Sequence, residues 1–285
     1  MGSSKCRPLA GCALAVVLLA GAVQIAPSAR AEQVASASTE QLLRAAIASP
    51  NRSEKARDRD RYRHPLETLT FLGLRPEMTV IELWPGGGWY TALLAPVLAE
   101  RGKLIVTSFD PNGPKDSELT AMARSLNTKL ASDPKTFGRV QTVVIAPPTN
   151  LTLGADSSAD MVLTFRNIHN WAAENYDDKV FAAAFKVLKS GGIFGVEEHR
   201  ARAGVPEAAS VRSGYMPEDY VIKKVEAAGF KFVAKSEINA NPKDTKDYPG
   251  GVWSLPPTLT LGEKNRDKYL AIGESDRMTL KFVKP

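Results

Sequence analysis

The sequence predicts an α/β fold, in which about seven strands form a doubly wound, mostly parallel sheet preceded by an N-terminal helical extension. From residue 79 onward, short apolar runs alternate with amphipathic helical patterns, and three consecutive glycines at 86–88 separate the first strand from the first helix. Strands that alternate with helices favour a parallel sheet covered on both faces. Ligands of such sheets bind outside the carboxyl ends of the strands, where the winding reverses.

The strands are expected where apolar runs lie between turn residues. They cover Thr79–Leu83, Lys103–Ser108, Val140–Ile145, Met161–Phe165, Ile193–Val196, Phe230–Ile238 and Met278–Val283. Helices are expected where apolar residues recur at intervals of three and four, over Tyr90–Glu100, Ser117–Ala131, Lys179–Leu188 and Glu218–Ala228. The stretch 239–276 is rich in Pro, Lys, Asp and Gly and predicts a long surface insertion between the last two strands.

Residues 32–64 predict a charged helical extension or linker, ahead of an α/β domain over 65–285. Ser38 and Gln41 have the spacing of a capping box, which is typical of a helix start. Residues 52–63 mix both signs of charge with almost no apolar residue, so they predict a solvated helix or linker that specifies no ligand.

Residues 1–31 have the layout of a secretory signal peptide. Two basic residues precede an uncharged apolar run over 9–23, and Ala29 and Ala31 offer small side chains at the cleavage positions. The run is shorter than the about twenty residues of a membrane span. We therefore expect cleavage after Ala31, export to the periplasm, and no stable membrane insertion of the mature chain. An uncleaved anchor helix is the alternative.

Cysteine usage and charge limit the possible chemistry. Cys6 and Cys12 both lie in the segment to be removed, so the mature chain would have no disulfide and no cysteine nucleophile.

Loss of Lys5, Arg7 and Arg30, with no acid in that stretch, lowers the formal charge from +6 to +3. That modest balance is not typical of nucleic-acid binding, so we expect no nucleic-acid partner. The oligomeric state stays open.

The glycine turn at 86–88 has the features of a cradle for a nucleotide-like ligand. Glycines let the backbone approach a ligand closely, and the free N–H groups of the next helix point into the turn. Glu82 lies on the preceding strand, where a carboxylate suits hydroxyl or ammonium groups better than phosphate. A dinucleotide site is less consistent with the sequence, because the third glycine of that motif is missing.

Four blocks of sequence occur in an order typical of one family. They are the glycine-rich motif at 80–88, Asp110 after the second strand, the fourth strand and its exit at 160–167, and the helix-to-strand turn at 186–192. Over about residues 65–285 the chain thus resembles the Rossmann-like class I S-adenosylmethionine (SAM)-dependent methyltransferases, and it looks closest to an exported group of bacterial predicted methyltransferases. Trp84 departs from the pattern, because the family usually has its first glycine there. It either packs in the core or lines the cofactor site.

The resemblance implies SAM as cofactor and an unidentified small molecule as methyl acceptor. The positions that match the family's cofactor site are Glu82, Gly86, Gly87, Gly88, Tyr90, Asp110 and Asn167. Aromatic faces can stabilise a cationic sulfonium, for which Trp89 and Tyr90 are the nearest candidates. Ordinary packing at the helix start is the alternative for both.

An acceptor that must lose a proton needs a general base. His199 follows the fifth strand and His169 follows the exit of the fourth, both on the expected active rim, with a structural role as the alternative for each. Glu197 and Glu198 alternate across the strand, so only one can face the crevice; Glu198 joins the two histidines as a candidate catalytic group. No third metal ligand accompanies His199 at a recognisable spacing, so no metal site is expected.

A second hypothesis is an exported small-molecule-binding protein that keeps the fold without methyl transfer. Trp84 and the lack of an acid after the third strand favour it, as does export away from the cytoplasm, where SAM is made. Glu82, the three glycines and Asp110 favour the enzyme.

Overall fold

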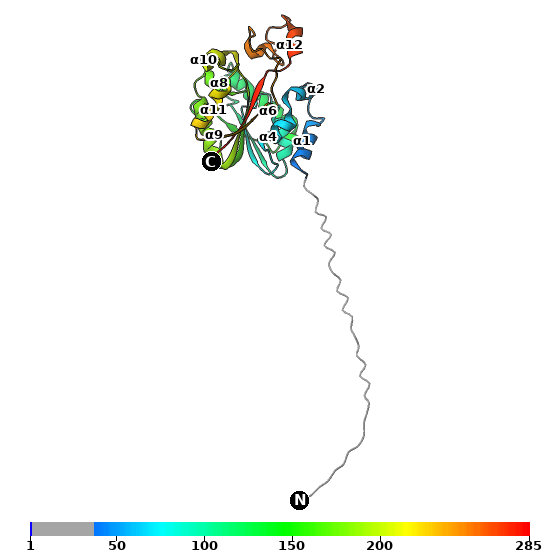
Figure 1. Ribbon diagram of the computed structural model, residues 1–285. Coiled ribbons are helices and arrows are strands. Elements are labelled where there is room, and N and C mark those ends of the chain that lie inside the picture. The colour runs from blue at the N-terminus through cyan, green and yellow to red at the C-terminus, as the bar shows by residue number, and fades with distance from the viewer. Residues whose placement is uncertain (2–36) are drawn as a thin grey trace. The chain divides into compact units, whose positions relative to one another are not determined.

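The computed structural model describes Met1 and residues 37–285, so Cys6, Cys12 and the expected cleavage site at Ala31 lie outside the described residues. Residues 37–285 form a seven-stranded sheet in the order β3-β2-β1-β4-β5-β7-β6 (Figure 1). The strands are β1 (Thr79–Leu83), β2 (Lys103–Ser108), β3 (Gln141–Val144), β4 (Ala159–Phe165), β5 (Leu188–His199), β6 (Lys231–Ser236) and β7 (Arg277–Val283). Among them β7 pairs antiparallel with both neighbours. The predicted mostly parallel, doubly wound sheet is confirmed.

Helices and short 3-10 turns connect the strands. They are α1 (Thr39–Ile47), α2 (Glu54–Arg57), α3 (Asp60–Arg63), α4 (Pro65–Leu72), α5 (Thr91–Leu98), α6 (Glu118–Ser132), α7 (Pro134–Phe137), α8 (Ile168–Ala173), α9 (Asp177–Val187), α10 (Glu207–Ser210), η1 (Val211–Ser213), α11 (Glu218–Ala227), η2 (Gly251–Ser254) and α12 (Arg266–Ile272). The capping box at the start of α1 forms as predicted. The helices α7, α8, α10 and α12 were not predicted, because segments of four to seven residues carry too little periodicity.

The sheet has a separate hydrophobic core on each face, and strand residues alternate between them. Val80 packs in the core that includes α4 and α5, whereas Ile81 and Leu83 pack in the core that includes α9 and α11. Glu82 therefore lies on the α5 face. The same alternation sends the side chains of Glu197 and Glu198 to opposite faces of β5.

The prediction that residues 52–63 are solvated holds for residues 53–55, 57, 58 and 61, which are exposed, but it fails at both ends of the stretch. Arg52 and Arg63 are only 4% and 3% exposed, and the guanidinium groups of both lie over the ring of Trp89, 5.1 and 4.7 Å from its centroid. Trp89 Nε1 also donates a hydrogen bond to the carbonyl of Ala56 at 2.9 Å. The extension therefore packs on the residues that lead into α5, and an indole holds the two arginines in place.

The stretch 239–276 lies between β6 and β7 as predicted, and with α12 it forms the lobe at the top of Figure 1. Its two ends are buried, however, so it is not only a surface insertion. The side-chain amide of Asn239 donates hydrogen bonds to the hydroxyls of Thr68 and Thr279, both at 2.9 Å. These bonds connect the insertion to α4 and β7, next to the carboxyl end of β5.

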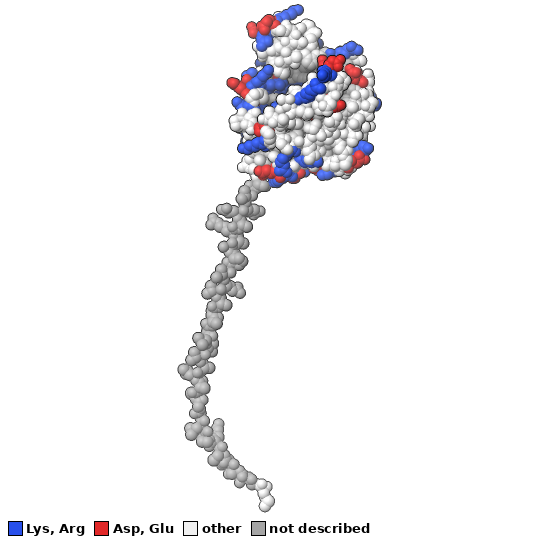
Figure 2. All heavy atoms as spheres, turned by 180° about the vertical axis from the view of Figure 1, so that it is seen from behind, with Lys and Arg blue, Asp and Glu red and all other residues white. Residues whose placement is uncertain are grey.

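The charge distribution agrees with the small net charge. On the face of the described residues in Figure 2, basic and acidic side chains are interspersed, without the continuous basic stripe typical of nucleic-acid binding. Among the described residues, none of the helices combines the length and apolar character needed to cross a membrane.

The substitution Gly195→Ala should destabilise the fold by overpacking the core. A Cβ at this position of β5 would lie 2.7 Å from Leu163 Cδ2 and 3.0 Å from Leu72 Cδ1, so the core must shift. We expect a loss of about 1–3 kcal/mol in the free energy of unfolding, measured with urea. Gly87→Ala is the matched control, because its Cβ would meet no atom within 4 Å and should leave stability unchanged. Equal stability of the two variants would contradict the packing described for β5.

Candidate functional site

A cavity of about 630 Å³ opens at the carboxyl ends of β1, β4 and β5. Its walls come from residues 51–63 of the extension, the turn 84–89 after β1, the exit 165–170 of β4, and segments 252–258 and 274–275 of the insertion. The winding of the sheet reverses between β1 and β4. The cavity therefore lies where ligands of doubly wound sheets bind, as the sequence predicts.

All three glycines of the turn line the cavity. Gly86 and Gly88 adopt positive φ angles of +55° and +68°, which other residues rarely tolerate. A Cβ at Gly86 or Gly87 would meet no atom within 4 Å, so open space lies over this part of the turn. A Cβ at Gly88 would instead come within 2.8 Å of Lys129 Cε. The turn thus offers an uncovered backbone surface at Gly86 and Gly87.

The two carboxylates that the sequence predicts at the cofactor are not among the residues lining this cavity. Glu82 is 1% exposed beneath the turn and accepts a 2.6 Å hydrogen bond from Thr91 Oγ1, at the start of α5. Burial raises the pKa of Glu82 to about 7. Asp110 is exposed and accepts a 2.8 Å hydrogen bond from the N–H of Asn112. Their roles in cofactor binding stay predictions.

Trp84 combines the two roles that the sequence left open. Its backbone has a φ of 45°, and its N–H donates to Thr107 Oγ1 at 2.8 Å, which fixes the turn to the end of β2. The indole contacts the rings of Phe109 and Trp171, at centroid distances of 6.0 and 5.0 Å, and also lines the cavity. Trp84 therefore covers part of one core while forming part of the wall.

The aromatic candidates are occupied by contacts within the protein. Tyr90 is buried, stacks on Phe165 at a centroid distance of 3.5 Å, and donates to Glu197 Oε2 at 2.5 Å. It is not among the residues lining the cavity. Trp89 does line it, but Arg52 and Arg63 lie over its ring. The alternative role in packing at the helix start is thus the better supported one for both.

Asn167 lines the cavity and connects two of its walls. Its side-chain amide donates to the carbonyls of Leu83 and Trp84, at 3.1 and 3.4 Å, and to Thr164 Oγ1 at 3.3 Å. These bonds hold the exit of β4 against the glycine turn. The position matches the prediction, and the observed contacts are those of a residue that positions the turn.

His169 and Glu198 form a buried pair on the α8 face of β5. His169 Nδ1 lies 3.0 Å from Glu198 Oε1, and the same carboxylate accepts from the backbone N–H groups of Ile168 at 2.6 Å and His199 at 2.8 Å. Because an ionised carboxylate can only accept hydrogen bonds, we assign the proton between Glu198 and His169 to Nδ1 of the histidine. Nε2 is then the ring nitrogen that carries the lone pair, and His169 is one of the residues that line the cavity.

His199 lies beside His169, with ring centroids 5.5 Å apart, and its Nδ1 is 2.5 Å from Ser275 Oγ. Burial, followed by the nearby His169 and Arg166, lowers the pKa of His199 well below its ordinary value, so this ring is neutral at pH 7. The structure thus brings together the three predicted catalytic candidates.

These three residues also form a group that could hold a metal ion, because their ligand atoms lie within 4.8 Å of one another. His169 supplies the third possible metal ligand, which the spacing of residues in the sequence did not reveal. Both oxygens of Glu198, however, already accept backbone hydrogen bonds. The contacts are those of a carboxylate that orients a histidine, and the absence of a metal stays a prediction.

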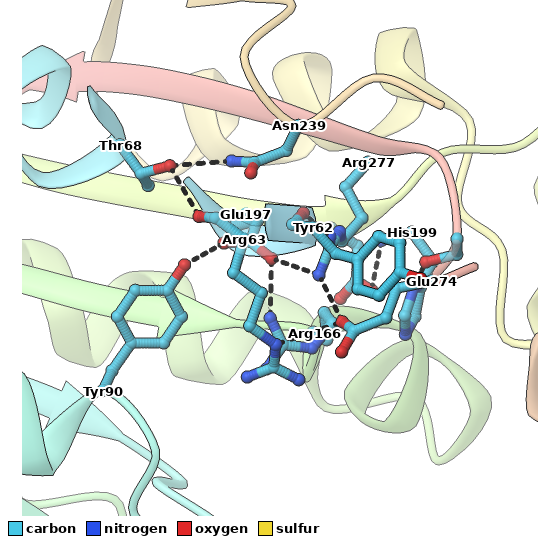
Figure 3. A network of polar contacts seen from close by, with 12 residues as sticks. Tyr62, Arg63, Thr68, Tyr90, Arg166, Glu197, His199, Asn239, Glu274 and Arg277 are labelled. Atoms are coloured by element: carbon cyan, nitrogen blue, oxygen red, sulfur yellow. Dashed lines mark hydrogen bonds and ion pairs between the residues drawn. The ribbon is translucent and has the colours of Figure 1, made fainter. Parts of the chain in front are cut away.

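A buried ionic network, part of which lines the cavity, was missed by the sequence analysis (Figure 3). Glu197 Oε1 is 2.6 Å from Arg166 Nη1 and 3.2 Å from Arg277 Nη1. Glu274 accepts from Arg59 at 2.5 Å, and from Arg63 and Arg277 at 3.0 Å each. We refer to these six residues, Arg59, Arg63, Arg166, Glu197, Glu274 and Arg277, as the arginine network.

Both carboxylates of the arginine network are ionised. Burial alone would raise the pKa of Glu274, but Arg63, Arg277 and Arg59 together hold it at about 2. Arg166 and Arg277 likewise overcome burial and lower the pKa of Glu197. An acid directly after a predicted apolar strand, such as Glu197 after Ile193–Val196, is the sequence signal that could have identified the network.

No model of a protein family matches the chain. Among solved structures, a SAM dependent methyltransferase from Aquifex aeolicus superposes with a TM-score of 0.52 at 16% identity, covering 80% of this chain and 93% of that one. The [4+2]-cyclase SpnF superposes with a TM-score of 0.55 at 14% identity, covering 87% and 97%. At these identities the similarity concerns the fold, and it agrees with the Rossmann-like architecture.

The substitution Glu82→Gln should change how stability depends on pH. A carboxyl group with a raised pKa in the folded state keeps its proton there after the unfolded chain has lost it. The contribution of Glu82 to stability therefore falls as the pH rises from about 4.5 to about 7. Glutamine keeps an acceptor for Thr91 without the charge, so its stability relative to wild type should rise by about 3 kcal/mol over this range. Urea unfolding of both proteins at pH 5 and 8 measures this, and a constant difference would contradict the burial of an ionisable Glu82.

Proposed function

We propose that the protein is a SAM-dependent methyltransferase that acts on a small molecule. The observation that carries the proposal is that the open backbone at Gly86 and Gly87 and the side chain of His169 line one cavity. SAM bound on the glycine turn and an acceptor bound beside His169 would therefore share one cavity. The similarity of fold to a SAM dependent methyltransferase supports the same class.

The residues present fit this cofactor at the glycine turn. SAM supplies a methyl group already activated on a sulfonium, so the protein has to bind, orient and exclude water. Gly86 and Gly87 leave space where larger residues would fill it, and Asn167 fixes the turn to β4. We retain Asp110 and Glu82 as proposed cofactor residues, with Glu82 acting through Thr91.

The paired side chains on β5 and α8 perform the proton transfer in this proposal. Nε2 of His169 removes the proton from the acceptor, while Glu198 holds Nδ1 and stabilises the imidazolium that forms. His199 is neutral and held by Ser275, so it can hydrogen-bond to the acceptor without taking its proton at neutral pH.

Calorimetric titration of the purified protein with SAM and with S-adenosylhomocysteine tests the cofactor directly. We expect saturable binding of both. The Gly87→Ala variant should keep the wild-type stability and lose at least about tenfold in affinity for both, because its Cβ enters the space over the turn. Absence of binding to the wild type would exclude the enzyme, and wild-type affinity in Gly87→Ala would exclude this turn as the binding surface.

We also propose that the chain is exported, on the strength of the N-terminal pattern of residues 1–31. The mature protein should begin at Glu32 and lie in the periplasmic fraction of an expressing bacterium with two membranes. Intact mass spectrometry of that fraction measures the start. A product that keeps residues 1–31 and fractionates with membranes would instead support the anchor helix.

A further inference from the structure

We propose that the methyl acceptor is a small organic anion, whose carboxylate or phosphate group is bound by Arg63 and Arg166. This inference rests on the proposed methyl transfer and specifies its substrate class. It is carried by the charge of the arginine network, by the donors that the network leaves unused, and by the position of those donors in the sheet.

The arginine network holds more positive than negative charge. Four guanidinium groups face two carboxylates, so two positive charges are left without a counterion inside the network. Burial, followed by the nearby Arg166, lowers the pKa of Arg63 to about 9, as expected for a cation that is incompletely compensated. Because an uncompensated buried charge is costly, a bound anion would stabilise this network.

Lysines add to the positive charge of the cavity. Lys55 and Lys129 line it, and neither forms an ion pair with an acid in residues 37–285. Among the lining residues that the structure describes, Glu274 is the only acid, and it is already shared among three arginines. The cavity is therefore suited to an anion and disfavours a divalent cation at the nearby histidines.

Arg63 presents unused donors to the cavity. Its side chain is 4% exposed, and within residues 37–285 its Nε donates to Glu274 while Nη1 and Nη2 donate to no protein acceptor. Arg166 likewise uses only Nη1, on Glu197. The guanidinium of Arg63 lies over the ring of Trp89, which restricts its orientation. A planar, fixed pair of donors matches the oxygens of a carboxylate or phosphate.

The position of these donors assigns them to the acceptor. Arg166 follows β4, and Arg277 and Glu197 lie on β7 and β5, whereas Asp110 follows β2 on the other side of β1. A cofactor held by the glycine turn and Asp110 lies over β1 and β2. Arg166 and His169 both belong to the exit of β4, and both line the cavity together with Arg63, so these donors share the cavity with the candidate base beside which the acceptor must lie. An anionic acceptor also offsets the positive sulfonium beside the arginines.

Titration with a matched pair of probes tests the inference. Benzoate and benzamide have the same shape and differ in charge, and inorganic phosphate tests the second anion class. In low-salt HEPES buffer we expect benzoate or phosphate to bind the wild type, and benzamide to bind at least about tenfold more weakly than benzoate. Equal affinity for benzoate and benzamide, or no binding of either anion, would overturn the inference.

Variants identify the residue responsible. Arg63→Met should lower the affinity for the bound anion by about tenfold or more, and Arg63→Lys should recover part of it. Lys129→Met serves as a second variant that breaks no ion pair between described residues, and we expect a loss of severalfold. Arg75→Met is the control, because Arg75 is exposed and pairs with Glu77 away from the cavity. Unfolding curves establish that each variant is folded.

Parallel titrations with SAM separate this inference from the proposed function. We expect SAM affinity in Arg63→Met to stay within about threefold of wild type. A large loss of SAM affinity with unchanged anion affinity would assign Arg63 to the cofactor and overturn the inference. Arg63-dependent anion binding without any SAM binding would instead support the anion site and exclude methyl transfer.

Discussion

The candidate site depends on one buried carboxylate, that of Glu197. It is fully buried and contacts Tyr90, Arg166 and Arg277, which come from the start of α5, the exit of β4 and the start of β7. A buried charge is tolerated only when it is paired, and removing one partner costs about 3–5 kcal/mol. Glu197 therefore fixes three separate segments of the chain at the same end of the sheet, the end at which the cavity opens.

The pleat of β5 explains why the two neighbouring acids Glu197 and Glu198 have different partners. Glu197 and Glu198 point to opposite faces, so one contacts arginines and the other holds His169. A shift of one residue in the register of β5 would exchange these environments. Both the arginine network and the orientation of His169 thus depend on the pairing of β5 with β4 and β7.

The sheet was predictable because its signals are local. Apolar runs and the three glycines each specify structure within a few residues, and all seven strands lie where they were expected. The contacts of the arginine network are not local: Arg63 and Glu274 are separated by 211 positions. Charge alone predicts exposure, so the burial of Arg52 and Arg63 could not be inferred without knowing that Trp89 lies against them. The position of the histidines after their strands predicted that they lie at this edge of the sheet, whereas the pairing of His169 with Glu198 was visible only in the fold.

Two of the segments that enclose the cavity, 51–63 and 252–258, belong to neither the strands nor the main helices of the sheet. They contribute Arg63 and Trp253, whereas the glycine turn and His169 come from the α/β framework itself. The enclosing segments thus supply one of the two arginines of the proposed anion site, whereas Arg166 and the proposed base come from the framework. A change in either enclosing segment would therefore reshape the cavity while leaving the strands of the sheet in place.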